Sequence, residues 1–177
     1  IEAVDVSDDR LDEARRRARR AGVHNVTTRV VAAEGELTVE PKPGEADVVL
    51  IDAPCSGLGT LRRNPDARWR LKSDAPERFA AIQEGLLARF APLVKPGGRL
   101  VYATCAIGRS ENDDVVGRFL AGNAGFARVP MAKLFGAALG DALVAAAPEG
   151  LDKETMHLFP HRHGTDGFFA AAMERAK

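Results

Sequence analysis

The two cysteines of the chain each follow an apolar run that predicts a buried β-strand. Cys55 lies in Asp52-Ala-Pro-Cys-Ser-Gly-Leu-Gly59, where one proline and two glycines favour a tight loop. Cys105 ends the run Tyr-Ala-Thr-Cys. Because parallel strands hold ligands at their carboxyl ends, the two thiols could converge on one site, where a thiolate would act as a nucleophile. The alternative is an ordinary buried cysteine in a turn.

Three acidic residues also lie at or near predicted strand ends: Asp5, Glu34 and Asp52. A carboxylate there can accept hydrogen bonds from both hydroxyls of a ribose, as in dinucleotide and S-adenosyl sites. Asp5 taken alone is more typical of a capping or surface aspartate. The three positions are therefore candidates for cofactor binding.

Metal ligands are not indicated by the spacing of the cysteines and histidines. The chain has no Cys-x-x-Cys, and His157, His161 and His163 fall in a segment without a clear periodic pattern. We expect these histidines to be exposed loop residues, and we predict no metal site.

Positive charge gathers in two places, although the formal net charge is +0. One is the run from Arg15 to Arg20, and the other comprises Arg62, Arg63, Arg68, Arg70 and Lys72. Such clusters could contact the phosphates of a nucleic acid, or they could simply form solvated surfaces. Trp69, inside the second cluster, could pack on a base or belong to the core.

The elements that would position these residues alternate between strands and helices. Apolar and β-branched runs predict strands over 2–6, 27–32, 47–52, 99–104 and 166–174. Apolar spacing and terminal signals predict helices over 8–21, 76–94 and 111–121, with Ser7 and Ser110 as N-caps and Gly22 and Lys95-Pro-Gly-Gly98 as stops. No element is predicted for 131–153. This order predicts an α/β fold with a mostly parallel sheet and helices on both faces.

Length and composition are compatible with one domain of 177 residues. No run approaches the roughly 20 apolar residues of a membrane span. Both cysteines belong to the motifs above, which favours a reducing cytoplasm over a disulfide scaffold. The chain does not begin with methionine and has no secretory signal, so we expect it to start within a longer protein.

The chain resembles the RNA (cytosine-5) methyltransferases of the Sun/Fmu type over nearly its whole length, least of all over 131–153. The resemblance is carried by Asp52-Ala-Pro-Cys-Ser-Gly, Arg62-Arg-Asn-Pro-Asp-Ala-Arg-Trp69, Tyr102-Ala-Thr-Cys105, Ser110-Glu-Asn and Asp166-Gly-Phe-Phe. It implies a Rossmann-like methyltransferase fold, S-adenosylmethionine as cofactor and RNA as substrate. Small-subunit ribosomal RNA is favoured, with tRNA as the alternative, and we expect a monomer.

The resemblance also implies residue roles. Cys105 would be the nucleophile and Cys55 would aid product release. Asp5, Glu34 and Asp52 would contact the ribose, the adenine and the methionine end of the cofactor in turn, although Glu34 replaces the family's usual aspartate. The family's first strand, Gly-rich loop and N-terminal RNA-binding region would lie before Ile1. Residues 1–177 are thus expected to form a single, N-terminally truncated catalytic domain.

The implied chemistry is covalent catalysis. A thiolate that adds to C6 of cytosine makes C5 nucleophilic enough to accept a methyl group. Asp52 could assist through N3 if burial keeps it protonated. A DNA-type mechanism, with Cys55 as the nucleophile, and a noncatalytic RNA-binding or assembly module are the competing interpretations.

Overall fold

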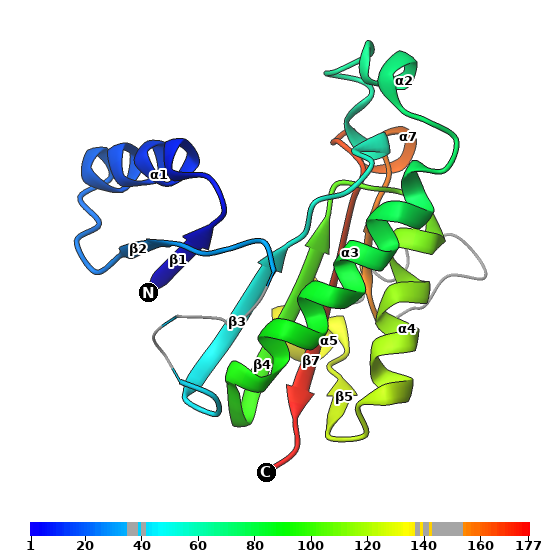
Figure 1. The fold of residues 1–177 in the computed structure, drawn as a ribbon. Helices are drawn as coiled ribbons and strands as arrows, with labels where there is room; N and C mark the ends of the chain where they lie inside the picture. The colour runs from blue at the N-terminus through cyan, green and yellow to red at the C-terminus, as the bar shows by residue number, and fades with distance from the viewer. Residues whose placement is uncertain (35–38, 40–41, 137–138, 140–141, 143–153) are drawn as a thin grey trace. The chain divides into compact units, whose positions relative to one another are not determined.

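The computed structural model describes residues 1–34, 39, 42–136, 139, 142 and 154–177 (Figure 1). The chain forms two compact units, Ile1–Lys42 and Pro43–Lys177. That residues 1–177 act as a single catalytic domain stays a prediction. Among the described helices, none is both long and apolar enough to cross a membrane.

The first unit contains two parallel strands and one helix. β1 (Glu2–Asp5) pairs with β2 (Thr27–Val30), and α1 (Asp8–Arg20) connects them. Ser7 precedes α1 as expected, but its side chain makes no capping bond. Its backbone N–H instead donates to Oδ1 of Asp5 at 2.8 Å. The helix ends one residue before Ala21, and Gly22 then turns the chain with a φ of 68°.

The second unit is built on a five-stranded sheet. Its strands are β3 (Ala46–Asp52), β4 (Val94–Thr104), β5 (Phe126–Arg128), β6 (Met156–Leu158) and β7 (Phe168–Arg175). β3 and β4 are parallel, and β7 runs antiparallel to β4, β5 and β6. Only β7 therefore opposes the common strand direction. The predicted α/β fold with a mostly parallel sheet is confirmed.

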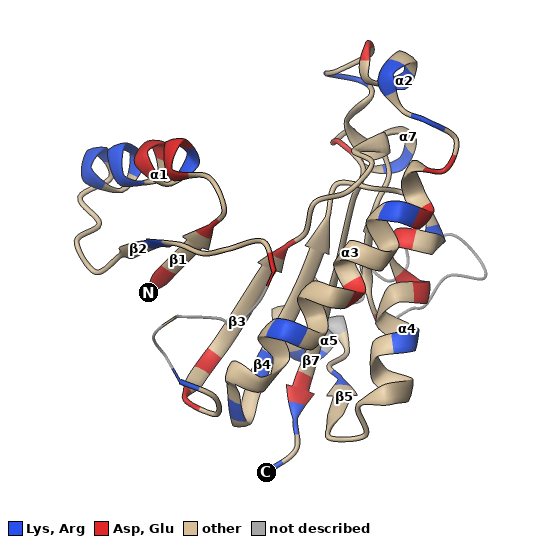
Figure 2. Ribbon diagram, viewed as in Figure 1, with Lys and Arg blue, Asp and Glu red and all other residues tan. Residues whose placement is uncertain are grey.

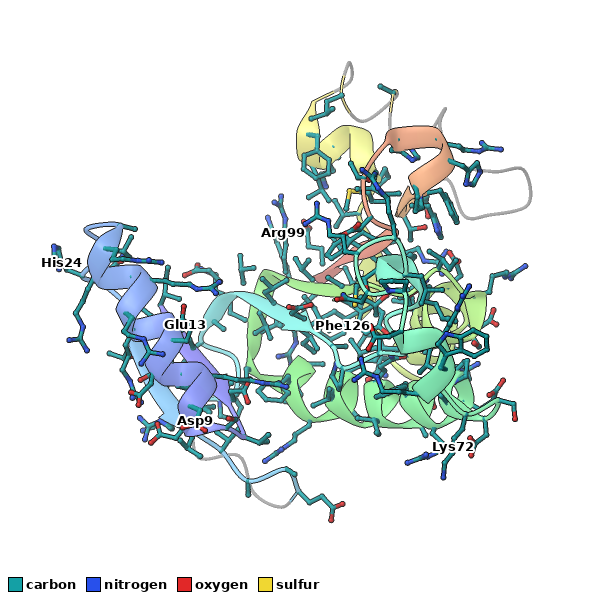
Figure 3. All side chains as sticks on the ribbon, turned by 90° about the horizontal axis from the view of Figure 1, so that it is seen from above. Asp9, Glu13, His24, Lys72, Arg99 and Phe126 are labelled. Atoms are coloured by element: carbon teal, nitrogen blue, oxygen red, sulfur yellow. The ribbon has the colours of Figure 1, made fainter. Side chains whose placement is uncertain are left out.

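Two long helices cover one face of this sheet. α3 (Ala75–Phe90) and α4 (Asp113–Gly122) lie together on one side, and the short α5 (Met131–Phe135) lies on the other (Figures 1 and 3). Burial of each large core side chain stabilises the fold by about 1.5–3 kcal/mol. The core includes Leu87, Leu100, Tyr102, Val115, Phe169 and Met173.

The sequence predicted that Lys95-Pro-Gly-Gly98 separates a helix from a strand. In the structure this segment is part of β4. α3 ends at Phe90, a 3₁₀ turn over Ala91–Leu93 follows, and β4 already begins at Val94. The pairing of β3 with β4 is irregular between Ala46 and Val48, opposite this segment. A Cβ on Gly98 would lie 2.9–3.0 Å from three backbone oxygens, so the close approach of β3 requires glycine there.

The helix predicted over 111–121 also begins later. Arg109–Glu111 forms a 3₁₀ turn and Asn112, not Ser110, precedes α4. Three further short helices are η1 (Leu58–Thr60), α2 (Ala67–Arg70) and α7 (Pro160–His163). They lie at the end of the sheet where β3 and β4 finish (Figure 1).

Candidate active site around Cys55 and Cys105

The two cysteines meet at the carboxyl ends of the adjacent strands β3 and β4. Asp52 pairs with Ala103, and the N–H of Ala53 donates to the carbonyl of Ala103 at 2.9 Å. The Sγ atoms of Cys55 and Cys105 lie 3.1 Å apart, and both residues are half-buried free thiols. The predicted convergence of the two thiols is therefore confirmed.

This contact shifts the pKa values of the two cysteines in opposite directions. The hydrogen bond from Cys55 lowers the pKa of Cys105 from 9.0 to about 7, against burial and the nearby charges of Asp52 and Glu111. The same bond, together with burial, raises the pKa of Cys55. The pair therefore favours ionisation of Cys105 over ionisation of Cys55.

A buried carboxylate fixes the loop that carries Cys55. Glu111, which is fully buried, accepts the backbone N–H of Ser56 at 2.7 Å and the Ser56 hydroxyl at 2.6 Å. Gln83, also fully buried, donates from Nε2 to the carbonyl of Pro54 at 2.9 Å. These bonds satisfy the carboxylate and hold the loop on both sides of Cys55.

The neighbouring Asn112 fixes the chain around Cys105 in the same way. The Thr104 hydroxyl donates to its Oδ1 at 2.6 Å, and its Nδ2 donates to the carbonyl of Ala106 at 3.1 Å. The sequence identifies residues 110–112 only as part of a motif. The structure shows that Glu111 and Asn112 position the two cysteine loops.

Two glycines allow a third segment to approach these loops. The N–H of Gly59 donates to the carbonyl of Cys105 at 2.9 Å, and the N–H of Gly167 donates to the carbonyl of Gly59 at 2.7 Å. A Cβ on Gly59 would lie 2.3 Å from the Gly167 oxygen and 2.6 Å from the Cys105 oxygen. This backbone contact explains why glycines appear in both the Pro-Cys and the Asp-Gly-Phe-Phe motifs.

The candidate cofactor acids occupy the two units separately. In the first unit, Asp5 ends β1, with Oδ1 bonded to Ser7 and Oδ2 3.7 Å from a guanidinium nitrogen of Arg10. Glu34 is exposed and follows β2. In the second unit, Asp52 ends β3 and is exposed, so its expected burial is not found.

These acids suit the chemistry of a ribose. Asp5 is half-buried at a strand end and keeps carboxylate lone pairs that hydroxyl groups could use. Asp52 receives no hydrogen bond at its carboxylate from the described residues. In each unit, a carboxylate at a strand end can thus accept hydroxyl protons of a nucleoside, and the individual roles stay predictions.

The expectation that His157 is an exposed loop residue is wrong. It lies in β6, is 3% exposed, and its Nε2 is 3.0 Å from the Thr155 hydroxyl and 3.3 Å from Oδ1 of Asp113. β6 has only three residues, too few for an alternating pattern to show in the sequence. His161 is exposed and His163 half-buried in α7. The described residues contain no group that could hold a metal ion.

Comparison with known proteins agrees with this architecture. Residues 1–174 match the model of the family described as 16S rRNA methyltransferase RsmB/F. The probable ribosomal RNA small subunit methyltransferase B of Synechocystis is 38% identical over 150 residues, which cover 81% of this chain and 31% of that protein. The chain spans about a third of the length of the curated relatives that it matches, between 26% and 39%.

Two solved structures extend the likeness to the fold. The crystal structure of PH0851 matches with a TM-score of 0.84 and 36% identity. The match covers 99% of this chain and 37% of the PH0851 chain. NSun6 from Pyrococcus horikoshii, solved with SFG, has a TM-score of 0.76 and 26% identity, covering 100% of this chain and 41% of its own. The fold is thus the Rossmann-like fold of methyltransferases, and the chain belongs to the 16S rRNA methyltransferase RsmB/F family.

Proposed function

We propose that the full-length protein methylates C5 of a cytosine in RNA, with S-adenosylmethionine as methyl donor and Cys105 as nucleophile. The observation that carries the proposal is the 3.1 Å contact between the two thiols, which lowers the pKa of Cys105. It supplies a thiolate near neutral pH at the carboxyl end of a parallel strand. The family assignment and the names of the relatives support small-subunit ribosomal RNA as the substrate.

The reaction begins at Sγ of Cys105. The thiolate adds to C6 of the cytosine, and the electron pair of the C5–C6 double bond becomes available at C5. The cofactor supplies an electrophilic methyl group that C5 can accept. The C5 proton must then leave, and its electron pair expels the Cys105 thiolate as the C6–S bond breaks. The cysteine is regenerated and the product is 5-methylcytosine.

Cys55 is suited to the second half of this sequence. The largest contribution to the raised pKa of Cys55 is its hydrogen bond to Cys105. Once the Cys105 sulfur is bonded to C6, that anionic acceptor no longer exists, and Cys55 can lose its proton more readily. A base is required at this stage, either Cys55 itself or a water that it orients.

The reverse assignment, with Cys55 as the nucleophile, is disfavoured by the same contact. The pKa of Cys55 is raised, and two hydrogen bonds to Glu111 hold its loop in place. Only a thiolate adds to C6. Cys105 has the lowered pKa and is therefore the better nucleophile.

The remaining residues bind and orient. Asp5, Glu34 and Asp52 are the candidate contacts for the cofactor, because carboxylates at strand ends accept hydroxyl and amine protons. The target base must leave its stack before both faces of the ring can be reached. Unpaired or looped RNA would lower the cost of that step.

The test is the identity of the product. Purified full-length protein is incubated with unmodified 16S rRNA, or tRNA as the alternative, and methyl-labelled S-adenosylmethionine. The RNA is then digested to nucleosides for mass spectrometry. Labelled 5-methylcytidine is expected from one RNA class. A label found only on another atom or nucleoside would contradict the proposal.

A further inference from the structure

Trp69 is the only tryptophan of the chain and lies in α2, which protrudes beyond the sheet (Figure 1). It is 78% exposed, so the interpretation of Trp69 as a core residue is wrong. Leaving a large aromatic side chain in water forgoes the free energy that its burial would supply. The ring is therefore accessible to a ligand.

The side chains around Trp69 favour a polyanion. The guanidinium of Arg68 stands 4.6 Å from the centre of the Trp69 ring, and no carboxylate of the described residues pairs with it. Lys72 likewise has no ion-pair partner in the described part of the chain, whereas Arg70 pairs with Asp66 at 2.6 Å. Figure 2 shows this positive charge on α2 and on the segment that follows it.

The same segment is tied to the cysteine site. Arg62 donates to the carbonyl of Gly164 at 2.8 Å, and Arg63 forms an ion pair with Asp166 at 3.1 Å. Asp166 precedes Gly167, whose N–H bonds Gly59, and Gly59 in turn bonds the carbonyl of Cys105. These contacts anchor the segment that leads into α2 to the loop that carries Cys105.

We propose that Trp69 and Arg68 form a stacking site for an unpaired base beside the target cytosine, while Lys72 contacts a phosphate of the same strand. The proposal rests on RNA being the substrate, as proposed above. Arg68 lies over the ring from one side, and the exposure of Trp69 leaves surface on which a base can stack. Every base offers an aromatic face, so such a site positions RNA without strict sequence selection.

The experiment compares an RNA that carries bases on both sides of the target cytosine with an RNA that lacks those neighbouring bases. Full-length protein is titrated with a labelled single-stranded RNA that contains one cytosine, and with the same RNA carrying abasic residues on both sides of it. Trp69→Ala is expected to weaken binding of the intact RNA by about 5- to 150-fold. It should change binding of the abasic RNA little. Trp69→Phe, which keeps an aromatic face, should retain most of the affinity.

A matched control removes another exposed aromatic side chain. Phe135 is also exposed, at 48%, but it lies in α5, outside the basic segment 62–72, so Phe135→Ala should bind both RNAs like the unaltered protein. Equal affinity of Trp69→Ala and the unaltered protein for intact RNA would overturn the stacking site. Equal losses on both RNAs would also overturn it, because the side chain would then not act through a base.

The failure of this proposal is distinguishable from failure of the proposed function. Base-dependent loss of affinity without any 5-methylcytidine formation would leave the stacking site in place and reject the methylation chemistry. Formation of 5-methylcytidine, with an unchanged KM for RNA in Trp69→Ala, would reject the stacking site alone.

Discussion

Replacing Cys55 with alanine removes the thiol that is hydrogen-bonded to Cys105. This bond is the largest cause of the low pKa of Cys105, about 7. Without it, the pKa of Cys105 should return to its ordinary 9.0 or rise above it, because burial opposes ionisation. The ionised fraction at pH 7 should therefore fall from about one half to about one hundredth, roughly 50-fold.

The expected change in alkylation rate is smaller than this fraction suggests. A thiolate of higher pKa is intrinsically more nucleophilic, by about 6- to 10-fold over such a change in pKa. Near pH 7, Cys55→Ala should therefore slow alkylation of Cys105 by roughly 5- to 8-fold. Above pH 10, where both proteins are ionised, the variant should react faster.

The assay is iodoacetamide alkylation across pH, followed by mass spectrometry of the tryptic peptide 100–109, which contains Cys105 and not Cys55. The midpoint of the rate profile is expected to move from about 7 to about 9 in Cys55→Ala. Cys55→Ser keeps a hydroxyl donor and should stay nearer the original midpoint. A midpoint that remains near 7 in Cys55→Ala would refute the reasoning.

Three further predictions concern the residues around this pair. Glu111→Ala should lower the free energy of unfolding by about 2–5 kcal/mol, because the buried donors of Ser56 lose their acceptor. Urea unfolding measures this, and Glu111→Gln, which keeps one acceptor oxygen, should lose less. Gly59→Ala should reduce methyl transfer on the order of 100-fold through displacement of the Cys105 backbone, whereas Gly85→Ala, where nothing lies within 4 Å of the new Cβ, should not. In the full-length protein, Asp5→Ala should weaken S-adenosylmethionine binding by about 10- to 150-fold in calorimetry, and Asp9→Ala should leave it unchanged.

The parts of the site that the sequence predicted are those governed by strand order. The apolar runs before Asp52 and before Cys105 predicted two strands of a mostly parallel sheet, and parallel strands end at the same edge of a sheet. The meeting of the two thiols at 3.1 Å follows from that geometry. The final strand was also predicted, but its antiparallel pairing with β4 has no local signal in the sequence.

The parts that the sequence missed depend on contacts between distant residues. Ser56 and Glu111 are 55 positions apart, and nothing local in either segment indicates that their side chains meet. The burial of Gln83 on a charged, amphipathic helix has the same origin. Proline and glycine usually end an element, but β4 includes Lys95-Pro-Gly-Gly98. β3 pairs with β4 on both sides of this segment. The segment 131–153, for which no element was predicted, lies mostly outside the described residues.

The central claim, that Cys105 attacks the base and Cys55 assists release, is tested most directly by trapping the covalent RNA adduct. Full-length Cys55→Ala is incubated with RNA and S-adenosylmethionine and run on a denaturing gel beside Cys105→Ala. The account predicts a slowly migrating protein–RNA band with Cys55→Ala, carrying a methylated base, and neither adduct nor methylation with Cys105→Ala. An adduct that persists in Cys105→Ala and disappears in Cys55→Ala would contradict it.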